Sequence, residues 1–174
     1  MASLNGSIYE RELVALLSGN RKVVDKISKK LDFISRESYR HMEQNPFYVT
    51  RAAGSKGADI IAARYDVTFV IEVKSSLNQV LTFSSSSGKN QEQAERVGER
   101  CSKSGLFLTY AYRMKNANGD PWMMFRVPGN PKGNARRLYS ILPEIEITKN
   151  NNYVMKWEKG LPLHSLMQYL KDSE

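Results

Sequence analysis

The chain has 174 residues, of which 41% are hydrophobic and 25% charged, and its formal net charge is +8. These values are typical of a single-domain protein that buries a core without a disulfide or a structural metal. Cys101 is the only cysteine, which excludes an internal disulfide framework and a multi-cysteine zinc site. Because no apolar run approaches the ~20 residues of a membrane helix and the first residues do not form a secretion signal, we expect a soluble, intracellular protein.

The basic charge indicates a polyanionic partner. The excess of Lys and Arg over Asp and Glu is +2 in residues 1–50, +2 in 51–110 and +4 in 111–174. The densest stretch sets six basic residues against Asp120 alone: Arg113, Lys115, Arg126, Lys132, Arg136 and Arg137. We therefore expect nucleic-acid binding, although a basic surface that serves only solubility stays open.

Three helices are expected in succession at the start of the chain. Apolar residues recur at helical spacing in residues 8–17 and again in 23–31, which predicts the first two. A third, more polar helix is expected to end at Gln44, because Asn45 precedes Pro46 and such a residue disfavours the helical conformation.

The rest of the chain mixes strands and helices. Apolar or alternating segments predict the strands. Helical spacing predicts one helix after the polar loop 84–88 and a last helix that Pro162 opens at its first position. The expected strands are 47–50, 60–63, 67–73, 106–112, 122–127, 145–147 and 153–157, and the expected helices are 91–104 and 162–170. This order predicts an α/β domain with a mixed central β-sheet flanked by helices.

Charged residues lie at the outer ends of the two apolar strands in the expected hairpin. With Tyr65-Asp66 as the turn, antiparallel pairing places Asp59 opposite Glu72, because each lies six residues from that turn. Lys74 shares the face of Glu72, since residues two apart on a strand point the same way. The two carboxylates are therefore expected to be neighbours.

Two carboxylates about 4 Å apart repel each other by roughly 1–4 kcal/mol. Protonation of one of them, pairing with Lys74 or binding of a divalent cation would relieve this repulsion. Oxygen ligands without sulfur or imidazole suit Mg²⁺ or Mn²⁺, which can activate a water and hold a phosphate oxygen. Lys74 could then offset charge in the transition state of phosphodiester hydrolysis. The structural alternative is a solvated strand face on which Asp59 caps the strand start.

Glu10 is a further candidate for this site. Ser7 and Glu10 have the spacing of a helix capping box, with Ser7 as the N-cap. A glutamate in a first helical turn can also project toward the carboxylates of a neighbouring strand. Both roles stay open at this point.

Five segments in order along the chain resemble the archaeal Holliday junction resolvases, a family of the PD-(D/E)xK nuclease superfamily. They are GSIYEREL, RAAGSKGADIIA, IEVKSS, EQAERVGERCSKSG and LFLTYAYR, and the closing NNNYVMKWEKGLPLHSLMQYL is similar to the family's last strand and helix. The resemblance covers most of the chain. It implies a single nuclease domain over residues 1–174, a restriction-endonuclease-like fold, and a cytoplasmic protein of archaeal or viral origin.

The resemblance also implies the catalytic residues. Glu10, Asp59 and Glu72 match the family's metal-binding carboxylates, and Lys74 matches its catalytic lysine. Ser55 resembles an active-site serine in the loop before the aspartate, with an ordinary turn serine as the alternative.

Basic positions are implied as DNA contacts. Arg11 and Arg51 match family positions that contact DNA, and we expect Lys56 and Lys89 to bind phosphates as well. For Arg11 the alternative is a solvated helix arginine.

Two departures from the family pattern are visible. Ala58 stands where the superfamily name has proline. Residues 21–44 are longer than the family's link between its first helix and first strand, which predicts a helical insertion that forms an extra layer, a dimer element or a DNA contact.

Other residues have two readings each. Gln93 is either a solvated helix residue or an outer contact to a metal-bound water. Phe83 either stacks on an unpaired base or packs into the core. Residues 122–125 are expected to be a core strand, with a dimer patch as the alternative. Gly88-Lys89 lacks the other residues of a P-loop, so no nucleotide cofactor is expected.

The sequence therefore predicts a Mg²⁺-dependent endonuclease that cuts four-way DNA junctions, with Mn²⁺ as a substitute. Paired cuts in a nearly two-fold junction imply a homodimer. The alternatives are a sequence-specific restriction or homing-type endonuclease of the same fold, and a DNA-binding module that does not cut. Clustered carboxylates argue against the last, because binding alone has no use for them beside phosphates.

Overall fold

A computed structural model of the chain describes residues 4–52, 57–84 and 88–174. Within these ranges the helices are α1 (Leu4–Leu17), α2 (Arg21–Ser28), α3 (Phe33–Gln44), α4 (Lys89–Lys103), α5 (Ala135–Ile141) and α6 (Leu163–Asp172), with a 3₁₀ turn η1 (Trp157–Lys159). The strands are β1 (Tyr48–Arg51), β2 (Ile60–Ala63), β3 (Thr68–Ser76), β4 (Val80–Thr82), β5 (Leu108–Met114), β6 (Trp122–Arg126), β7 (Glu146–Ile147), β8 (Tyr153–Lys156) and β9 (Leu161–Pro162). None of the helices described here is long and apolar enough to cross a membrane.

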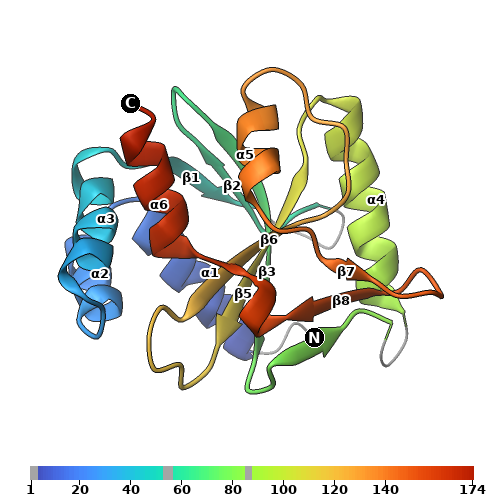
Figure 1. Cartoon of the computed structure of the whole chain (residues 1–174), viewed down its shortest axis with the longest axis horizontal. Coiled ribbons are helices and arrows are strands. Elements are labelled where there is room, and N and C mark those ends of the chain that lie inside the picture. Colours follow the sequence, from blue (N-terminus) through green and yellow to red (C-terminus); the bar gives the residue numbers. More distant parts are fainter. Residues whose placement is uncertain (1–3, 53–56, 85–87) are drawn as a thin grey trace.

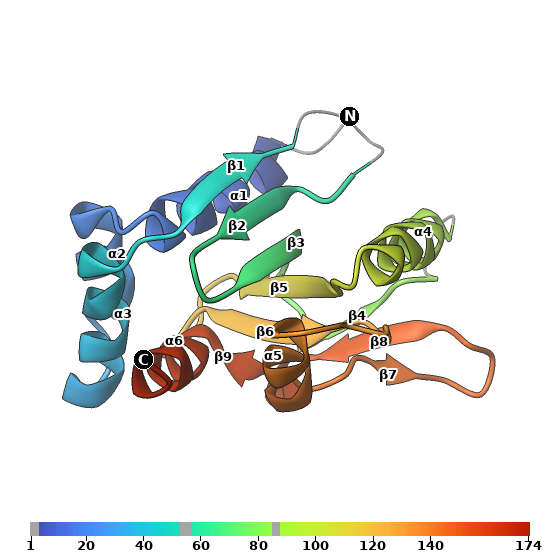
Figure 2. The same ribbon diagram turned by 90° about the horizontal axis from the view of Figure 1, so that it is seen from above.

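The centre of the fold is a six-stranded mixed sheet, which confirms the expected α/β class. Its strand order is β1-β2-β3-β5-β6-β9, with β3 and β5 parallel and the other neighbours antiparallel. The second sheet, β4-β8-β7, has three strands. Figure 2 shows the main sheet between α4 on one side and α3 with α6 on the other.

Each face of the main sheet has its own hydrophobic core. Phe69, Ile71 and Val73 of β3 pack on one face with apolar residues of α1, α2, α3 and α6. Val70, which alternates with them along β3, packs on the opposite face, in the core that contains Leu108 and apolar residues of α4. This alternation along β3 follows from the two-residue period of a strand that is covered on both sides.

The hairpin of β2 and β3 has the expected register. Arg64 and Val67 exchange backbone hydrogen bonds of 2.8 and 3.2 Å around Tyr65-Asp66, which confirms the two-residue turn. Ile60 pairs with Ile71. One position further out, the same register places Asp59 opposite Glu72.

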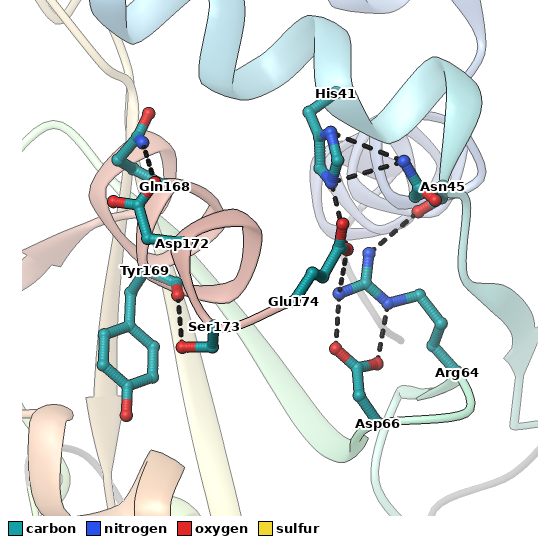
Figure 3. Close-up of polar contacts among 9 residues, drawn as sticks. All are labelled: His41, Asn45, Arg64, Asp66, Gln168, Tyr169, Asp172, Ser173 and Glu174. Atoms are coloured by element: carbon teal, nitrogen blue, oxygen red, sulfur yellow. Dashed lines mark hydrogen bonds and ion pairs between the residues drawn. The ribbon is translucent and has the colours of Figure 1, made fainter.

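The hairpin turn is anchored by a buried arginine (Figure 3). Arg64 donates from Nε and Nη2 to the two carboxylate oxygens of Asp66, at 2.7 and 2.6 Å, and from Nη1 to the Asn45 carbonyl at 3.1 Å. Glu174 lies 3.6 Å from Arg64 Nη2 and 3.1 Å from His41 Nε2. The turn is thereby tied both to the end of α3 and to the residues after α6.

Residues 21–44 form the two helices expected there. The side chain of Asn20 accepts a hydrogen bond from the Val23 amide at the start of α2, and that of Asp32 accepts one from Ser35 at the start of α3. Both are ordinary N-caps. That this segment is an insertion relative to the resolvases stays a prediction.

Several local expectations differ from the structure. Helix α1 begins at Leu4, so Ser7 lies inside the helix and is not its N-cap. Helix α5 and strands β4 and β9 were not expected, because segments of seven, three and two residues are too short to show a period. Pro162 is the last residue of β9 and the N-cap of α6, whereas it was expected to be the first residue inside that helix.

Candidate active site

Glu72 is a buried carboxylate in the middle of the main sheet. It is 3% exposed and lies on β3 with the parity of Val70, on the face that α4 covers. Its partner in the neighbouring parallel strand is Tyr110 of β5. A carboxylate in such a position needs polar partners, because burying an unpaired charge is costly.

The two oxygens of Glu72 have different surroundings. Oε1 accepts hydrogen bonds from Lys74 Nζ at 3.3 Å and from Gln93 Nε2 of α4 at 2.9 Å. Oε2 is buried and has no hydrogen-bond partner in the part of the chain that the structure describes. One side of this carboxylate is therefore fixed by the protein, and the other has an unused acceptor.

Asp59 lies beside Glu72 at the start of β2. Its Oδ2 accepts a hydrogen bond of 2.8 Å from the backbone amide of Val73, which holds the carboxylate against the adjacent strand. The neighbouring pair that the hairpin register predicts is therefore present.

The pKa shifts show that the two carboxylates interact. Burial, and next the charge of Asp59, raise the pKa of Glu72 from 4.5 to about 7. Burial also raises the pKa of Asp59, with a further contribution from Glu10 and against the hydrogen bond from Val73. Burial and a neighbouring negative charge each favour the neutral form of a carboxyl group.

Glu10 reaches this region from another direction. It belongs to α1, whose apolar side packs on the face of the sheet opposite α4. Its Oε2 accepts a hydrogen bond of 2.6 Å from Arg51 Nη2 at the end of β1. The negative charge of Glu10 raises the pKa of Asp59. The Glu10 carboxylate itself is paired with Arg51, a residue that was expected to contact DNA.

The donor set fits a hard cation through two carboxylates. Among the described residues, no group of three or more His, Cys, Asp or Glu side chains is arranged to hold a metal ion. Mg²⁺ usually takes one or two carboxylates and completes its shell with waters and phosphate oxygens. Asp59 fits that mode, and so does Glu72 Oε2, which no described residue engages. Glu10 as a third ligand stays a prediction.

The other expected site residues are placed less specifically. Arg11 of α1 is exposed, and so is Lys89, the first residue of α4. Ser55 and Lys56 lie outside the described residues. The proposed roles of these four residues therefore stay predictions.

Two ambiguous residues have definite positions in the structure. Gln93 is not merely solvated, because its amide donates to Glu72. Phe83 is fully buried, with its ring centroid 4.8 Å from that of Tyr110, so the core role is the correct one. The strand 122–125 is likewise largely buried, as expected.

Tyr110 is a polar residue at the site that sequence reasoning missed. Its hydroxyl is buried and has no hydrogen-bond partner within the described ranges. Burial, followed by the charges of Glu72 and Asp59, raises its pKa, so the phenol stays neutral. The β-rich segment 106–112 contained no signal for this role, because the pairing of Tyr110 with Glu72 comes from a crossover between distant strands.

Comparison with known proteins bears on the fold. Neither a scan of protein-family models nor a search of curated protein sequences found a match. Among solved structures, the Holliday junction resolvase Hjc of the hyperthermophilic archaeon Archaeoglobus fulgidus is similar, with a TM-score of 0.53. The similarity covers 94% of this chain and 96% of the resolvase at 17% sequence identity. The chain has the resolvase fold.

The resolvase fold confirms what the sequence motifs implied about architecture. The mixed central sheet with flanking helices is the restriction-endonuclease-like architecture expected from the resemblance. A shared fold at 17% identity does not extend to activity, since one fold carries many functions. The function is therefore argued from the site.

Proposed function

We propose that the protein is a Mg²⁺-dependent endonuclease that cuts four-way DNA junctions. The observation that carries this proposal is the Asp59–Glu72 pair, with Lys74 on the same side and a buried Glu72 oxygen that has no hydrogen-bond partner among the described residues. The net charge of +8 and the resolvase fold support DNA as the substrate. Mn²⁺ is expected to replace Mg²⁺.

The carboxylate pair, Gln93 and Lys74 have distinct tasks in the proposed hydrolysis. Asp59 and Glu72 hold the cation, and Gln93 keeps Glu72 oriented through its hydrogen bond to Oε1. When bound, Mg²⁺ supplies an activated water and neutralises charge on the phosphate. Lys74 stabilises the negative charge that develops on the scissile phosphate.

Basic side chains around this site are proposed to bind DNA without reading its sequence. Arg11, Arg51 and Lys89 of the described chain, together with Lys56, would contact phosphates and thereby position the junction. A junction has near two-fold symmetry and needs a cut in each of two opposing strands. A homodimer is therefore part of the proposal.

Cleavage of a fixed four-way junction, with Mg²⁺ or with a chelator, tests the proposal. We expect Glu72→Gln to bind the junction but to cut it at least about tenfold more slowly, because the neutral amide is a poor cation ligand. Glu92→Gln is the matched control, since Glu92 is exposed on α4. Near-normal cutting by Glu72→Gln would contradict the mechanism.

Linear duplexes of varied sequence belong in the same experiment. A junction resolvase cuts the four-way junction and leaves the duplexes largely intact. Cutting of one duplex sequence in preference to the junction would instead indicate a sequence-specific endonuclease. Salt-dependent binding without any product would indicate a DNA-binding module.

A further inference from the structure

Helix α2 and the two residues after it carry half of the net charge of the chain. Residues 21–30 contain five basic side chains and one acidic side chain, Asp25, which gives +4 of the total +8. All five basic residues are exposed: Arg21, Lys22, Lys26, Lys29 and Lys30. Val24 and Ile27 of the same helix are buried in the core. The five basic residues are called the α2 ridge below.

Local pairing leaves most of the α2 ridge unneutralised. Asp25 lies 4.0 Å from Arg21 Nε, in an exposed pair of the kind that contributes little. Asp32, the next acidic residue, is engaged as the N-cap of α3 through hydrogen bonds to Ser35. Within the described ranges, none of the four lysines of the ridge forms an ion pair.

The ridge borders a cleft that can admit an anionic group. Lys26 of α2 and Lys30, two residues after the end of that helix, line a cleft of about 280 Å³ together with Arg113 and the turn between β5 and β6. Arg113 is held in place by Glu12, at 2.7 Å from its Nε, and lies over the ring of Tyr9. Lys26 and Lys30 thus bring to the cleft two ammonium groups that form no ion pair with the residues that the structure describes.

Helix α1 links this surface to the candidate active site. Glu10 and the last residue of α1, Leu17, are about 10 Å apart along the helix axis at 1.5 Å per residue. Helix α2 begins a few residues later, and Figure 1 shows α1 running toward it. The α2 ridge therefore lies within about one turn of B-DNA, ~34 Å, of Glu10.

We propose that the α2 ridge binds the phosphate backbone of a duplex DNA arm, away from the scissile phosphate. This inference rests on DNA being the substrate and assigns a task to the helical segment 21–44. Within residues 21–30 the exposed side chains are all charged and no apolar one is exposed, which suits phosphates, whereas a protein interface would present an apolar centre. The contact is independent of base sequence.

Two charge-matched variants test the α2 ridge. Lys26→Gln/Lys30→Gln and Lys149→Gln/Lys171→Gln each remove two exposed lysines and lower the net charge from +8 to +6. Binding to a fixed four-way junction and to a linear duplex is measured by fluorescence anisotropy over a range of salt concentrations. For the α2 variant, the slope of log K against log[salt] should become shallower by about 1–2 units, and binding should weaken roughly fivefold or more at 0.1 M salt.

The control variant should bind within about twofold of the wild type, since only non-local charge has changed. Equal salt slopes for the two variants would overturn the proposal. Lys26→Arg/Lys30→Arg should restore the wild-type slope, and equal melting temperatures establish that all variants are folded. Failure of the arginine variant to restore binding would also overturn the phosphate contact.

Anionic vesicles separate DNA from a membrane surface as the partner. Phe33 and Ile34, 73% and 69% exposed at the start of α3, would also suit a bilayer. Vesicle binding that depends on Lys26 and Lys30, with an unchanged DNA slope, would overturn the proposal. If the wild type binds DNA but never cuts it, the proposed nuclease function fails while the comparison of slopes still decides the role of α2.

Discussion

Glu72 combines two properties that rarely occur together in one residue. It belongs to the interior of a six-stranded sheet, and one of its oxygens has no partner within the described chain. Burial and the neighbouring Asp59 favour its protonated form, whereas Lys74 and the amide of Gln93 favour the charged form. A cation would tip this balance toward the carboxylate, which is what a metal site requires.

Glu72 should make the stability of the protein depend on pH. Because the pKa of Glu72 is raised to about 7 in the folded state, the folded protein holds this proton more tightly than the unfolded chain does. Protonated Glu72 therefore contributes to the free energy of unfolding, fully at a pH below its ordinary pKa of 4.5, and this contribution is lost as the pH rises through about 7. The Glu72→Gln variant has a neutral amide at every pH, so its stability does not decrease for this reason.

The measurement is chemical denaturation of both proteins in the presence of a chelator. The variant and the wild type should have similar unfolding free energies near pH 4.5, and the variant should gain by roughly 1–3 kcal/mol relative to the wild type near pH 8. Other titrating groups cancel in the difference between the two proteins. A difference that does not change with pH would contradict the raised pKa.

Gln93 provides the second prediction. We expect Gln93→Leu to cut junctions about tenfold to a hundredfold more slowly at limiting Mg²⁺, because an unsupported Glu72 binds the cation less well. Since the amide donor favours the charged carboxylate, its loss should also shift the pH–rate profile to higher pH.

Rates measured across Mg²⁺ concentration and pH check both effects. Glu92→Ala, one position earlier and exposed, is the control. A role of Gln93 in folding alone would lower the rate at all Mg²⁺ concentrations without moving the pH profile. That outcome would remove Gln93 from the site.

At the scale of elements, the β2–β3 hairpin is the unit that assembles the site. Its turn fixes the register, and the register places Asp59 next to Glu72. The turn itself depends on Arg64, whose side chain is only 5% exposed. The geometry of the carboxylates is therefore coupled to contacts at the opposite end of the hairpin.

Replacement of Arg64 tests this dependence. Arg64→Met would leave Asp66 without its bidentate partner and the Asn45 carbonyl without its donor, and we expect a loss of roughly 2–4 kcal/mol in unfolding free energy. Arg21→Met is the control, because its pair with Asp25 is exposed and should change stability by less than about 0.5 kcal/mol. Equal stability of the two variants would show that the turn does not need Arg64.

The elements also show which parts of the site the sequence can predict. Alternation along β3 and equal distances from a two-residue turn were sufficient to place Asp59 opposite Glu72, because both are local properties of a hairpin. Gln93 and Tyr110 meet Glu72 only through packing of α4 and pairing of β5, so no local pattern in their own segments predicts the contact. The Glu10–Arg51 pair likewise depends on how α1 meets β1.

At the scale of the whole molecule, the proposed activity requires two sites. One chain of 19.8 kDa carries one Asp59–Glu72 pair, whereas resolution of a junction needs two cuts in opposing strands. A two-fold dimer supplies them with matching symmetry. We therefore expect light scattering to give a mass of about 40 kDa in solution, twice the chain mass.

A plasmid with an extruded cruciform tests whether the two sites act together. A wild-type dimer that stays bound through both cuts should convert the plasmid directly to the linear form. Mixed dimers with one Glu72→Gln subunit should produce nicked circles, because one site of each pair is inactive. Nicked circles from the wild type would show that the two cuts are uncoupled, and a monomeric mass would rule out the homodimer. Neither result would contradict the chemistry proposed at Asp59 and Glu72.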